Sequence, residues 1–198
     1  MIIWINGAFG SGKTSTAFEL YRRLPNSHVF DPEEAGYYIR KNVPKEVAKR
    51  DFQDFPMWRD INYQMLYHLS QNYKGVVIVP MTIVDPLYFE EIVGRLRDQQ
   101  VSVHHFTLWA EKETLQKRLR KRGERKGSWA EQQIERCLTG LSHECFETRV
   151  SSEQMSVQEQ VEWIADKLAL KLNPDTRGPM KKKLDQWRTQ IQHIRWFQ

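Results

Sequence analysis

Residues 7–14 read Gly7-Ala8-Phe9-Gly10-Ser11-Gly12-Lys13-Thr14, and they match the pattern G-x-x-x-x-G-K-[ST] at every fixed position. An apolar run, Ile2 to Ile5, precedes this segment, and a stretch with helical spacing, Lys13 to Leu24, follows it. Glycines let the backbone curl so that its N–H groups converge on phosphate oxygens, and the following helix directs its positive end to the same place. The segment therefore predicts a phosphate-binding loop between a strand and a helix.

Two residues give this loop its expected chemistry. Lys13 is predicted to bridge the outer phosphates of ATP, and the Thr14 hydroxyl is predicted to bind Mg²⁺ between the β- and γ-phosphates. The alternative is a glycine-rich turn with a solvated lysine, which the flanking strand and helix disfavour. The residues predicted to bind the nucleotide are Gly7, Ala8, Phe9, Gly10, Ser11, Gly12, Lys13, Thr14 and Ser15.

Apolar, β-branched runs recur along the chain between stretches with helical spacing. This alternation predicts an α/β fold, with a doubly wound, five-stranded, mostly parallel sheet flanked by helices. Strands are expected at 2–6, 28–31, 75–80, 101–108 and 148–151. Helices are expected at 13–24, 57–71, 87–99 and 111–122, and capping boxes predict two further helix starts at Ser128 and Ser156.

Length and composition fit one soluble domain with appendages. A chain of 198 residues, with 40% hydrophobic and 28% charged residues, is long enough for one sizeable core. No apolar run approaches the ~20 residues that span a bilayer, and no signal-like segment precedes the first strand. Cys137 and Cys145 lack metal-ligand spacing. We therefore expect a cytoplasmic protein.

The net charge of +5 is concentrated in two segments, so a nucleic-acid partner is not expected. One segment, Lys117 to Lys126, holds seven Lys or Arg and one Glu, and we interpret residues 117–130 as a lid. Its Arg118, Arg122 and Arg125 are predicted catalytic residues, because guanidinium groups stabilise the charge on a γ-phosphoryl group with paired hydrogen bonds. The alternative is a solvated, basic helix face.

Asp31 is the candidate residue for contact with the molecule that accepts the phosphoryl group. It stands at the end of the second expected strand, where ligands of open parallel sheets bind. Asp31 is predicted to position or deprotonate the attacking hydroxyl, and its alternative role is a helix N-cap before Pro32. After the third strand the chain reads Val79-Pro80-Met81-Thr82, without the acid that usually positions Mg²⁺ there. The predicted substrate-binding residues are Asp31, Tyr38, Arg40, Phe52, Phe55, Trp58, Arg59 and Thr82, and core packing is the alternative for each ring.

A break near Asn173-Pro174 separates an ATP-binding domain, 1–172, from a C-terminal extension, 173–198. An amphipathic helix is expected over 179–198, with a basic face opposite its apolar stripe. Two interpretations are open, namely peripheral contact with anionic lipid headgroups and packing as a last core helix. The stripe consists of Met180, Leu184, Trp187, Ile191 and Ile194.

Six segments together resemble the tunicamycin resistance protein family, whose members are ATP-binding proteins of the P-loop kinase group. The resemblance implies a sheet like that of nucleoside monophosphate, shikimate and gluconate kinases, with a mobile arginine lid. It also implies an antibiotic ligand, because the family confers resistance to tunicamycin, a fatty-acylated nucleoside that contains uridine. The segments are Met1–Asn6 before the loop, Val79–Val84, His104–Leu108, Glu113–Leu115, Ser128–Ala130 and Pro174–Gly178.

The predicted activity is an ATP-dependent phosphotransferase that moves the γ-phosphate to a hydroxyl of tunicamycin or a related nucleoside or sugar. Its small-molecule substrate and ATP with Mg²⁺ are then its expected ligands. One alternative is ATP-dependent sequestration of the drug at the membrane face without chemistry. Another is a metabolite kinase of the gluconate or shikimate type.

Overall fold

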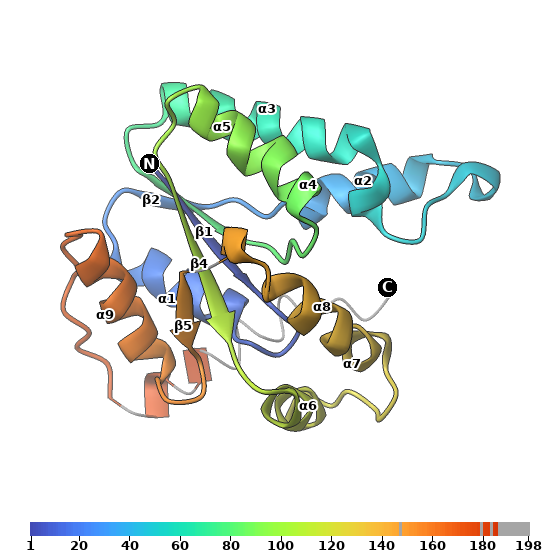
Figure 1. Cartoon of the computed structure of the whole chain (residues 1–198). Helices are drawn as coiled ribbons and strands as arrows, with labels where there is room; N and C mark the ends of the chain where they lie inside the picture. Colours follow the sequence, from blue (N-terminus) through green and yellow to red (C-terminus); the bar gives the residue numbers. More distant parts are fainter. Residues whose placement is uncertain (147, 179, 183, 186–198) are drawn as a thin grey trace.

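The strand that leads into the phosphate-binding loop, β1 (Ile2–Gly7), lies in the middle of the sheet in this computed structural model (Figure 1). The structure describes residues 1–146, 148–178, 180–182 and 184–185. Within these residues five strands lie in the order β2-β3-β1-β4-β5, and every pairing is parallel. The prediction of a doubly wound α/β sheet is confirmed. The other strands are β2 (Ser27–Val29), β3 (Val76–Pro80), β4 (Val103–Trp109) and β5 (Arg149–Ser151).

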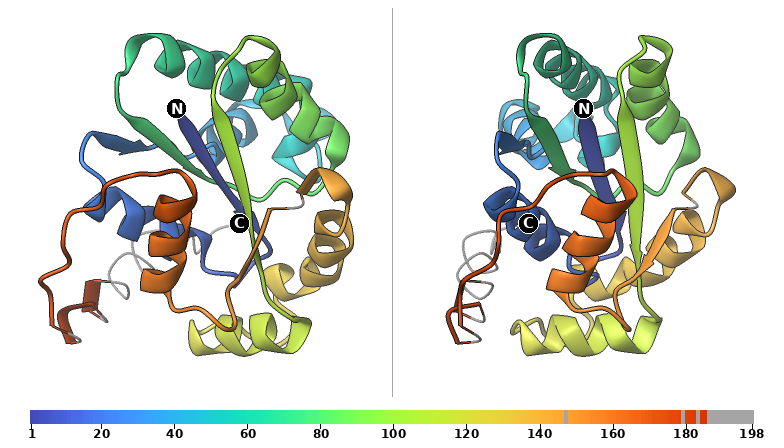
Figure 2. Two further views of the ribbon diagram at one scale, coloured as in Figure 1. Left: turned by 60° about the vertical axis from the view of Figure 1, so that its left-hand side comes forward. Right: turned by 90° about the vertical axis from the view of Figure 1, so that its left-hand side faces the viewer.

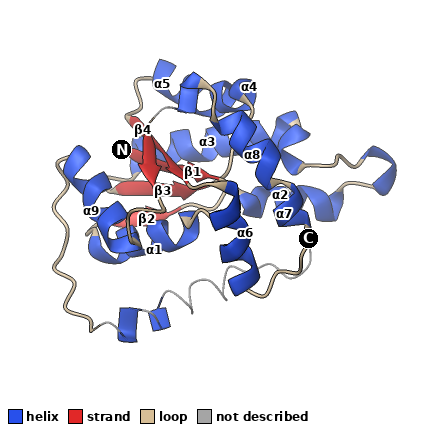
Figure 3. Ribbon diagram, turned by 60° about the horizontal axis from the view of Figure 1, so that its bottom comes forward, coloured by secondary structure: helices blue, strands red, loops and turns tan. Residues whose placement is uncertain are grey.

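Every residue of β1 is buried, because helices cover both faces of the sheet. On one face α1 (Lys13–Arg23) packs beside α9 (Val157–Lys167), as Figure 2 shows. On the other face lie α3 (Pro56–Asn72) and α5 (Arg95–Asp98), so that Figure 3 shows strands between two helical layers. Each layer encloses one hydrophobic core.

The remaining helices surround the carboxyl ends of the strands, where the phosphate-binding loop lies (Figure 1). The helix predicted over 87–99 contains a π-helical stretch, Glu90–Gly94, between α4 and α5. The described helices of this region are α2 (Glu33–Asn42), α4 (Pro86–Phe89), α6 (Lys112–Lys121), α7 (Trp129–Gln132) and α8 (Ile134–Leu141).

The two predicted capping boxes have different outcomes. At Ser156 the box forms, because the Ser156 hydroxyl accepts from the Glu159 amide and the Glu159 carboxylate accepts from the Ser156 amide. At Ser128 only half of the box forms. The Ser128 hydroxyl accepts from the Glu131 amide, but the Glu131 carboxylate accepts from the amide of Gly127, one residue earlier.

The segment after α9 runs along the outer end of α1. The Asn173 amide donates to the Arg23 carbonyl at 2.7 Å, and Arg177 pairs with Glu19 of α1. Most of the predicted helix over 179–198, including its residues Trp187, Ile191 and Ile194, lies outside the described residues. In the described part of the chain, no helix has the length and apolarity needed to cross a membrane.

Candidate nucleotide and acceptor site

The phosphate-binding loop curls tightly between β1 and α1. Gly12 has a φ of +105°, a conformation that side chains with a Cβ rarely adopt, and it lies directly before α1. At Gly7 a Cβ would lie 2.7 Å from the Leu108 carbonyl oxygen, so this position also requires glycine. No side chain caps the start of α1. Its first amides therefore face the loop, as an anion site at a helix N-terminus requires.

Lys13 is held inside the loop by the loop's own carbonyl groups. Its Nζ donates to the carbonyl oxygens of Gly7 at 2.9 Å and Ala8 at 3.1 Å. Burial, with a smaller effect of nearby Arg122, lowers the pKa of Lys13 to about 8, while Cys137 and Glu33 oppose the shift. Phosphate oxygens are stronger partners for an ammonium group than neutral carbonyls. The Lys13 ammonium group can therefore leave these carbonyls and bind a phosphate chain.

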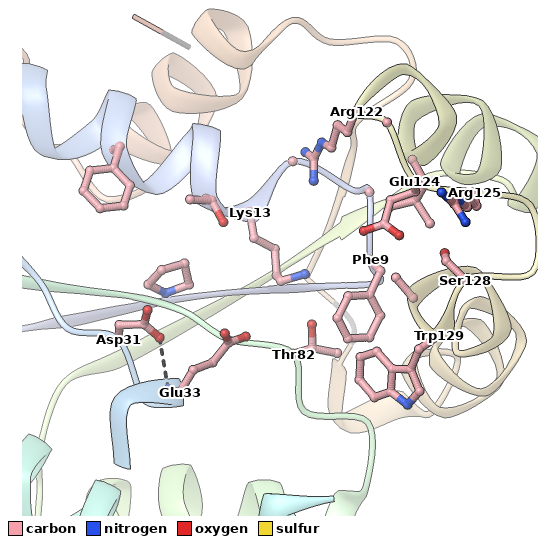
Figure 4. Close-up of a pocket in the computed structure, with 18 of the residues that line it drawn as sticks. Phe9, Lys13, Asp31, Glu33, Thr82, Arg122, Glu124, Arg125, Ser128 and Trp129 are labelled. Carbon is pink, nitrogen blue, oxygen red and sulfur yellow. Dashed lines mark hydrogen bonds between the residues drawn. The ribbon is translucent and has the colours of Figure 1, made fainter. Parts of the chain in front are cut away.

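A cavity of about 920 Å³ opens above Lys13, between the loop, the end of β2 and the lid segment (Figure 4). Figure 4 shows Asp31 and Glu33 on one side of this cavity and Arg122 and Arg125 on the other, with Lys13 between them. Aromatic side chains also line it, and Phe9 and Trp129 meet edge to face at 5.1 Å. Its other charged residues are Glu34, Glu124 and Lys126.

The three predicted lid arginines lie on two sides of the loop. Arg122 and Arg125 line the large cavity, and burial lowers the pKa of Arg122, with neighbouring Arg118 adding to the shift. Arg118 instead reaches the loop after β5, where it donates to the Ser152 hydroxyl at 3.0 Å and to the Ser152 carbonyl. The structure therefore brings Arg122 and Arg125 to the large cavity, and Arg118 to the loop carbonyls of Gly10 and Ser11.

A second, smaller cavity of about 410 Å³ lies on the Arg118 side of the loop. Ser11 lines this small cavity, and its hydroxyl is buried with no hydrogen-bond partner among the described residues. Because buried polar groups are normally satisfied, this hydroxyl is suited to a ligand. The small cavity is lined by Gly10, Ser11, Gly12, Ser15, Arg118, Lys121, Arg122, Ser152, Met155, Ser156, Val157, Gln158 and Gln160.

The acidic side of the large cavity is built by the start of α2. Asp31 lines the cavity and accepts a hydrogen bond from the Glu33 amide, the first of α2, at 3.0 Å. The N-cap residue of α2 is Pro32 and not Asp31, so the alternative role of Asp31 as the N-cap is not what the structure shows. Tyr37 donates to the Glu33 carboxylate at 2.9 Å. Figure 4 shows this carboxylate directed toward Lys13 and Thr82. Sequence reasoning missed Glu33, although the Asp31-Pro32 helix start places the next acid in the first helical turn.

Thr82 lines the large cavity, but its hydroxyl is used within the fold. It donates to the Gly7 carbonyl at 2.8 Å, and the Thr82 carbonyl accepts from Gln53 at 2.9 Å. Gly7 therefore accepts from both Lys13 and Thr82. The Thr82 hydroxyl therefore links the turn after β3 to the start of the phosphate-binding loop.

The three aromatic residues predicted to bind substrate lie in the core instead. Phe52 and Phe55 are less than one tenth exposed, and Trp58 is fully buried, with its indole N–H donating to the Pro32 carbonyl at 2.9 Å. None of these rings lines the large cavity. The structure favours core packing over substrate contact for all three, because they belong to one buried hydrophobic cluster and bury large apolar rings there.

The remaining predicted substrate residues also lie away from the large cavity. Arg59 is buried, where it pairs with Glu91 and donates to the Gln53 carbonyl at 2.5 Å. The Arg40 guanidinium lies 5.1 Å from the Phe52 ring centre, and Tyr38 is 67% exposed. These residues shape the surroundings of α2 and α3, and they do not meet a ligand in the cavity beside Lys13.

Comparison with known proteins places this site in a family. A family model described as an AAA domain matches residues 2–142. The solved structure of the tunicamycin resistance protein of Deinococcus radiodurans is 38% identical in sequence, with a TM-score of 0.75, and the match covers 88% of this chain and 98% of that chain. This chain belongs to the tunicamycin resistance protein family.

The tunicamycin resistance family shares its fold with several kinases. A sugar kinase from Janibacter matches at 15% identity and a TM-score of 0.63, over 85% of this chain and 94% of that chain. Shikimate kinase from Bacteroides thetaiotaomicron matches at 16% identity and a TM-score of 0.58, over 86% and 99%. A search of curated proteins found no match. Family and fold give the protein an ATP-binding, kinase-like function.

Segments that carry the resemblance to the tunicamycin resistance family meet at the phosphate-binding loop. Met1–Asn6 contains most of β1 and runs into the loop, and Val79–Val84 contains the end of β3 and the turn with Thr82. Ser128–Ala130 contributes to the large cavity, and His104–Leu108 lies in β4, which pairs with β1. These four segments therefore lie beside the phosphate-binding loop or line the large cavity next to it.

Proposed function

We propose that this protein transfers the γ-phosphoryl group of ATP to a hydroxyl of tunicamycin or of a related nucleoside or sugar. The observation that carries the proposal is the position of Lys13 on a phosphate-binding loop that borders both cavities. The small cavity is basic, and the large cavity has an acidic wall. This arrangement suits a donor and an acceptor that meet at one phosphoryl group.

The small cavity is suited to the nucleoside part of ATP. It adjoins the loop on the side of Arg118, whose planar guanidinium group can stack on a base, and the unpartnered Ser11 hydroxyl lies next to it. The triphosphate then follows the loop amides toward Lys13. These features together fit a polyphosphate chain that runs from the small cavity into the large one.

The Thr14 hydroxyl, at the start of α1, would hold Mg²⁺ beside the phosphates. When bound, this ion neutralises charge on the β- and γ-phosphates. Among the described residues, no group of three or more His, Cys, Asp or Glu is arranged to hold a metal ion by itself. This fits an ion that takes most of its oxygen ligands from the nucleotide and water.

Asp31 is assigned to the acceptor hydroxyl because its carboxylate lines the large cavity on the side opposite the lid. The hydroxyl oxygen attacks the γ-phosphorus, the bond from this phosphorus to the bridging oxygen of ADP breaks, and the hydroxyl proton passes to the Asp31 carboxylate. Arg122 and Arg125, on the opposite side, stabilise the charge on the phosphoryl oxygens during transfer.

The sign of the charge on the acceptor side favours an uncharged acceptor. Asp31, Glu33 and Glu34 all line this side of the cavity. Carboxylates repel an anionic ligand, and this repulsion is strong where water is partly excluded. A nucleoside or sugar without a negative charge therefore suits the site better than shikimate or gluconate, each of which carries a carboxylate.

The test is the mass of tunicamycin after incubation with the full-length protein and Mg²⁺-ATP. We expect a product heavier by one phosphoryl group, its loss in Lys13→Ala, and a strong reduction in Asp31→Asn. Asp98→Asn, at an exposed carboxylate at the end of α5, is the matched control and should leave the yield unchanged. Binding of unmodified drug with ATP would indicate sequestration instead, and phosphorylation of shikimate or gluconate alone would indicate a metabolite kinase.

A further inference from the structure

The side chain of Asn6, the residue before the loop, is fully buried and joins two segments of backbone. Its Oδ1 accepts from the Gly7 amide at 2.8 Å and from the Ile83 amide at 3.1 Å. Its Nδ2 donates to the Ile83 carbonyl at 2.8 Å. One amide group therefore fixes the first residue of the phosphate-binding loop and the turn after β3 relative to each other.

His105, on the neighbouring strand β4, supplies the last partner of Asn6. The Asn6 Nδ2 lies 3.1 Å from the His105 Nε2, and this contact uses its second N–H. The opposite orientation of the amide would bring Nδ2 against two backbone donors, so the four contacts allow one orientation. Within it the His105 Nε2 must accept, which requires a neutral ring protonated on Nδ1.

The surroundings of His105 keep its ring neutral and fixed. Phe89 lies edge to face with the ring at 4.8 Å, and Phe146 lies 5.7 Å from it. Burial, with a smaller effect of Arg97, lowers the pKa of His105 to about 3. The ring therefore remains an acceptor for Asn6 throughout the pH range in which the protein is expected to work.

The turn that Asn6 fixes carries Thr82, which shares the Gly7 carbonyl with Lys13. The Gly7 carbonyl accepts from both Lys13 and Thr82. When Lys13 turns toward a phosphate, Thr82 still satisfies this buried carbonyl, provided that the turn stays in place. Without that partner the move would leave an unsatisfied buried acceptor, which costs free energy.

We propose that His105 is a positioning residue for nucleotide binding. By accepting from Asn6 it holds Gly7 and the turn that carries Thr82 in the geometry that lets Lys13 leave the loop carbonyls. The proposal rests on nucleotide binding at the loop and not on the identity of the acceptor. It also gives a role to His105, a residue of β4 that takes no part in the proposed phosphoryl transfer.

The test compares two substitutions of His105 in the full-length protein. His105→Leu removes the acceptor, whereas the side-chain oxygen of His105→Gln can replace it. We expect His105→Leu to weaken Mg²⁺-ATP binding about tenfold, as the loss of one buried hydrogen bond predicts, and His105→Gln to restore most of the affinity. His104→Leu is the control, because His104 contacts the Ser102 hydroxyl and not Asn6, and its affinity should not change.

Calorimetric titration with Mg²⁺-ATP and thermal unfolding of each variant separate positioning from a general loss of stability. Equal affinity of His105→Leu and the parent, or equal losses in the Leu and Gln variants, would overturn the proposal. If His105→Leu does not fold, Thr82→Val provides the second test, since it removes the hydroxyl that still satisfies the Gly7 carbonyl after Lys13 leaves it. An unchanged affinity in folded Thr82→Val would overturn the proposal as well, whereas a parent protein that binds no nucleotide would overturn the proposed function itself.

Discussion

Lys13 Nζ lies 2.9 Å from the carbonyl oxygen of Gly7, the residue that opens the loop to which both belong. A second loop carbonyl, that of Ala8, accepts from the same ammonium group at 3.1 Å. Two of the three donors of the ammonium group are therefore bound by the loop itself. When a nucleotide binds, phosphate oxygens must replace these carbonyl partners of Lys13.

The affinity for Mg²⁺-ATP should depend on the protonation of Lys13. Burial lowers its pKa to about 8, whereas a bound triphosphate favours the charged form and raises it. Affinity should therefore be constant below pH 8 and fall by up to about tenfold for each pH unit above it. Titrations from pH 6 to 10 measure this profile, and calorimetry in two buffers should detect proton uptake at pH 8. An affinity that stays constant to pH 10 would contradict the assignment.

Substitution of Ser11 should have opposite effects on the free and the bound protein. Its hydroxyl is buried without a partner among the described residues, so Ser11→Ala removes an unsatisfied group and should raise the stability of the nucleotide-free protein by up to ~1 kcal/mol. The same change should weaken nucleotide binding. Thermal unfolding with and without Mg²⁺-ATP measures both effects. A variant that loses stability without nucleotide and binds it normally would exclude a ligand-binding role for this hydroxyl.

Arg177 should contribute strongly to folding stability. Its side chain is 10% exposed and pairs with Glu19 of α1, itself 1% exposed, and with Asp175 and Asp185. Arg177→Met removes the cation that these three carboxylates share, although Glu19 keeps Arg22 and Asp175 keeps Lys182. The substitution should therefore cost about 2 kcal/mol in urea unfolding. Arg95→Met is the matched control, because the pair of Arg95 with Asp60 is exposed on both sides and should be worth less than ~1 kcal/mol. Equal losses in the two variants would show that the Arg177 cluster is not buried in solution.

The same cluster should resist acid. Arg177 holds the pKa of Asp175 well below its ordinary value, and Lys182 adds to the shift. A depressed carboxyl pKa stabilises the fold fully above the unfolded value of about 4, and this contribution disappears as the pH falls through the folded value. In Arg177→Met the acid-unfolding midpoint should therefore move to higher pH. An unchanged midpoint would show that Arg177 does not lower the pKa of Asp175 in solution.

Sequence reasoning succeeded where the signal is local. The loop Gly7–Thr14, the strand before it and the helix after it follow from adjacent residues with fixed conformational demands. The alternation of strands and helices predicted the sheet in the same way, and Asp31 lies on the cavity wall as its place after β2 suggests. These features depend on backbone chemistry and strand order, which a single sequence contains.

The structure differs from the sequence-based expectations at side chains whose direction depends on tertiary packing. Phe52 and Trp58 suit a nucleoside as well as a core, and only their packing against each other and within the core decides between these roles. Arg118 and Arg122 are one helical turn apart, yet the loop after β5 draws Arg118 to Ser152. The contact of Asn6 with His105 joins residues 99 positions apart, and no local pattern indicates it.

The central claim is that the loop amides and the Lys13 ammonium group bind the triphosphate of ATP. The most direct measurement is the dissociation constant of Mg²⁺-ATP for the full-length protein and for Lys13→Ala, with Lys74→Ala as the control at an exposed lysine. We predict saturable binding to the parent and to Lys74→Ala, and a loss of at least about a hundredfold in Lys13→Ala, as removal of a buried charge partner implies. No binding to the parent protein, or undiminished binding to Lys13→Ala, would contradict the claim.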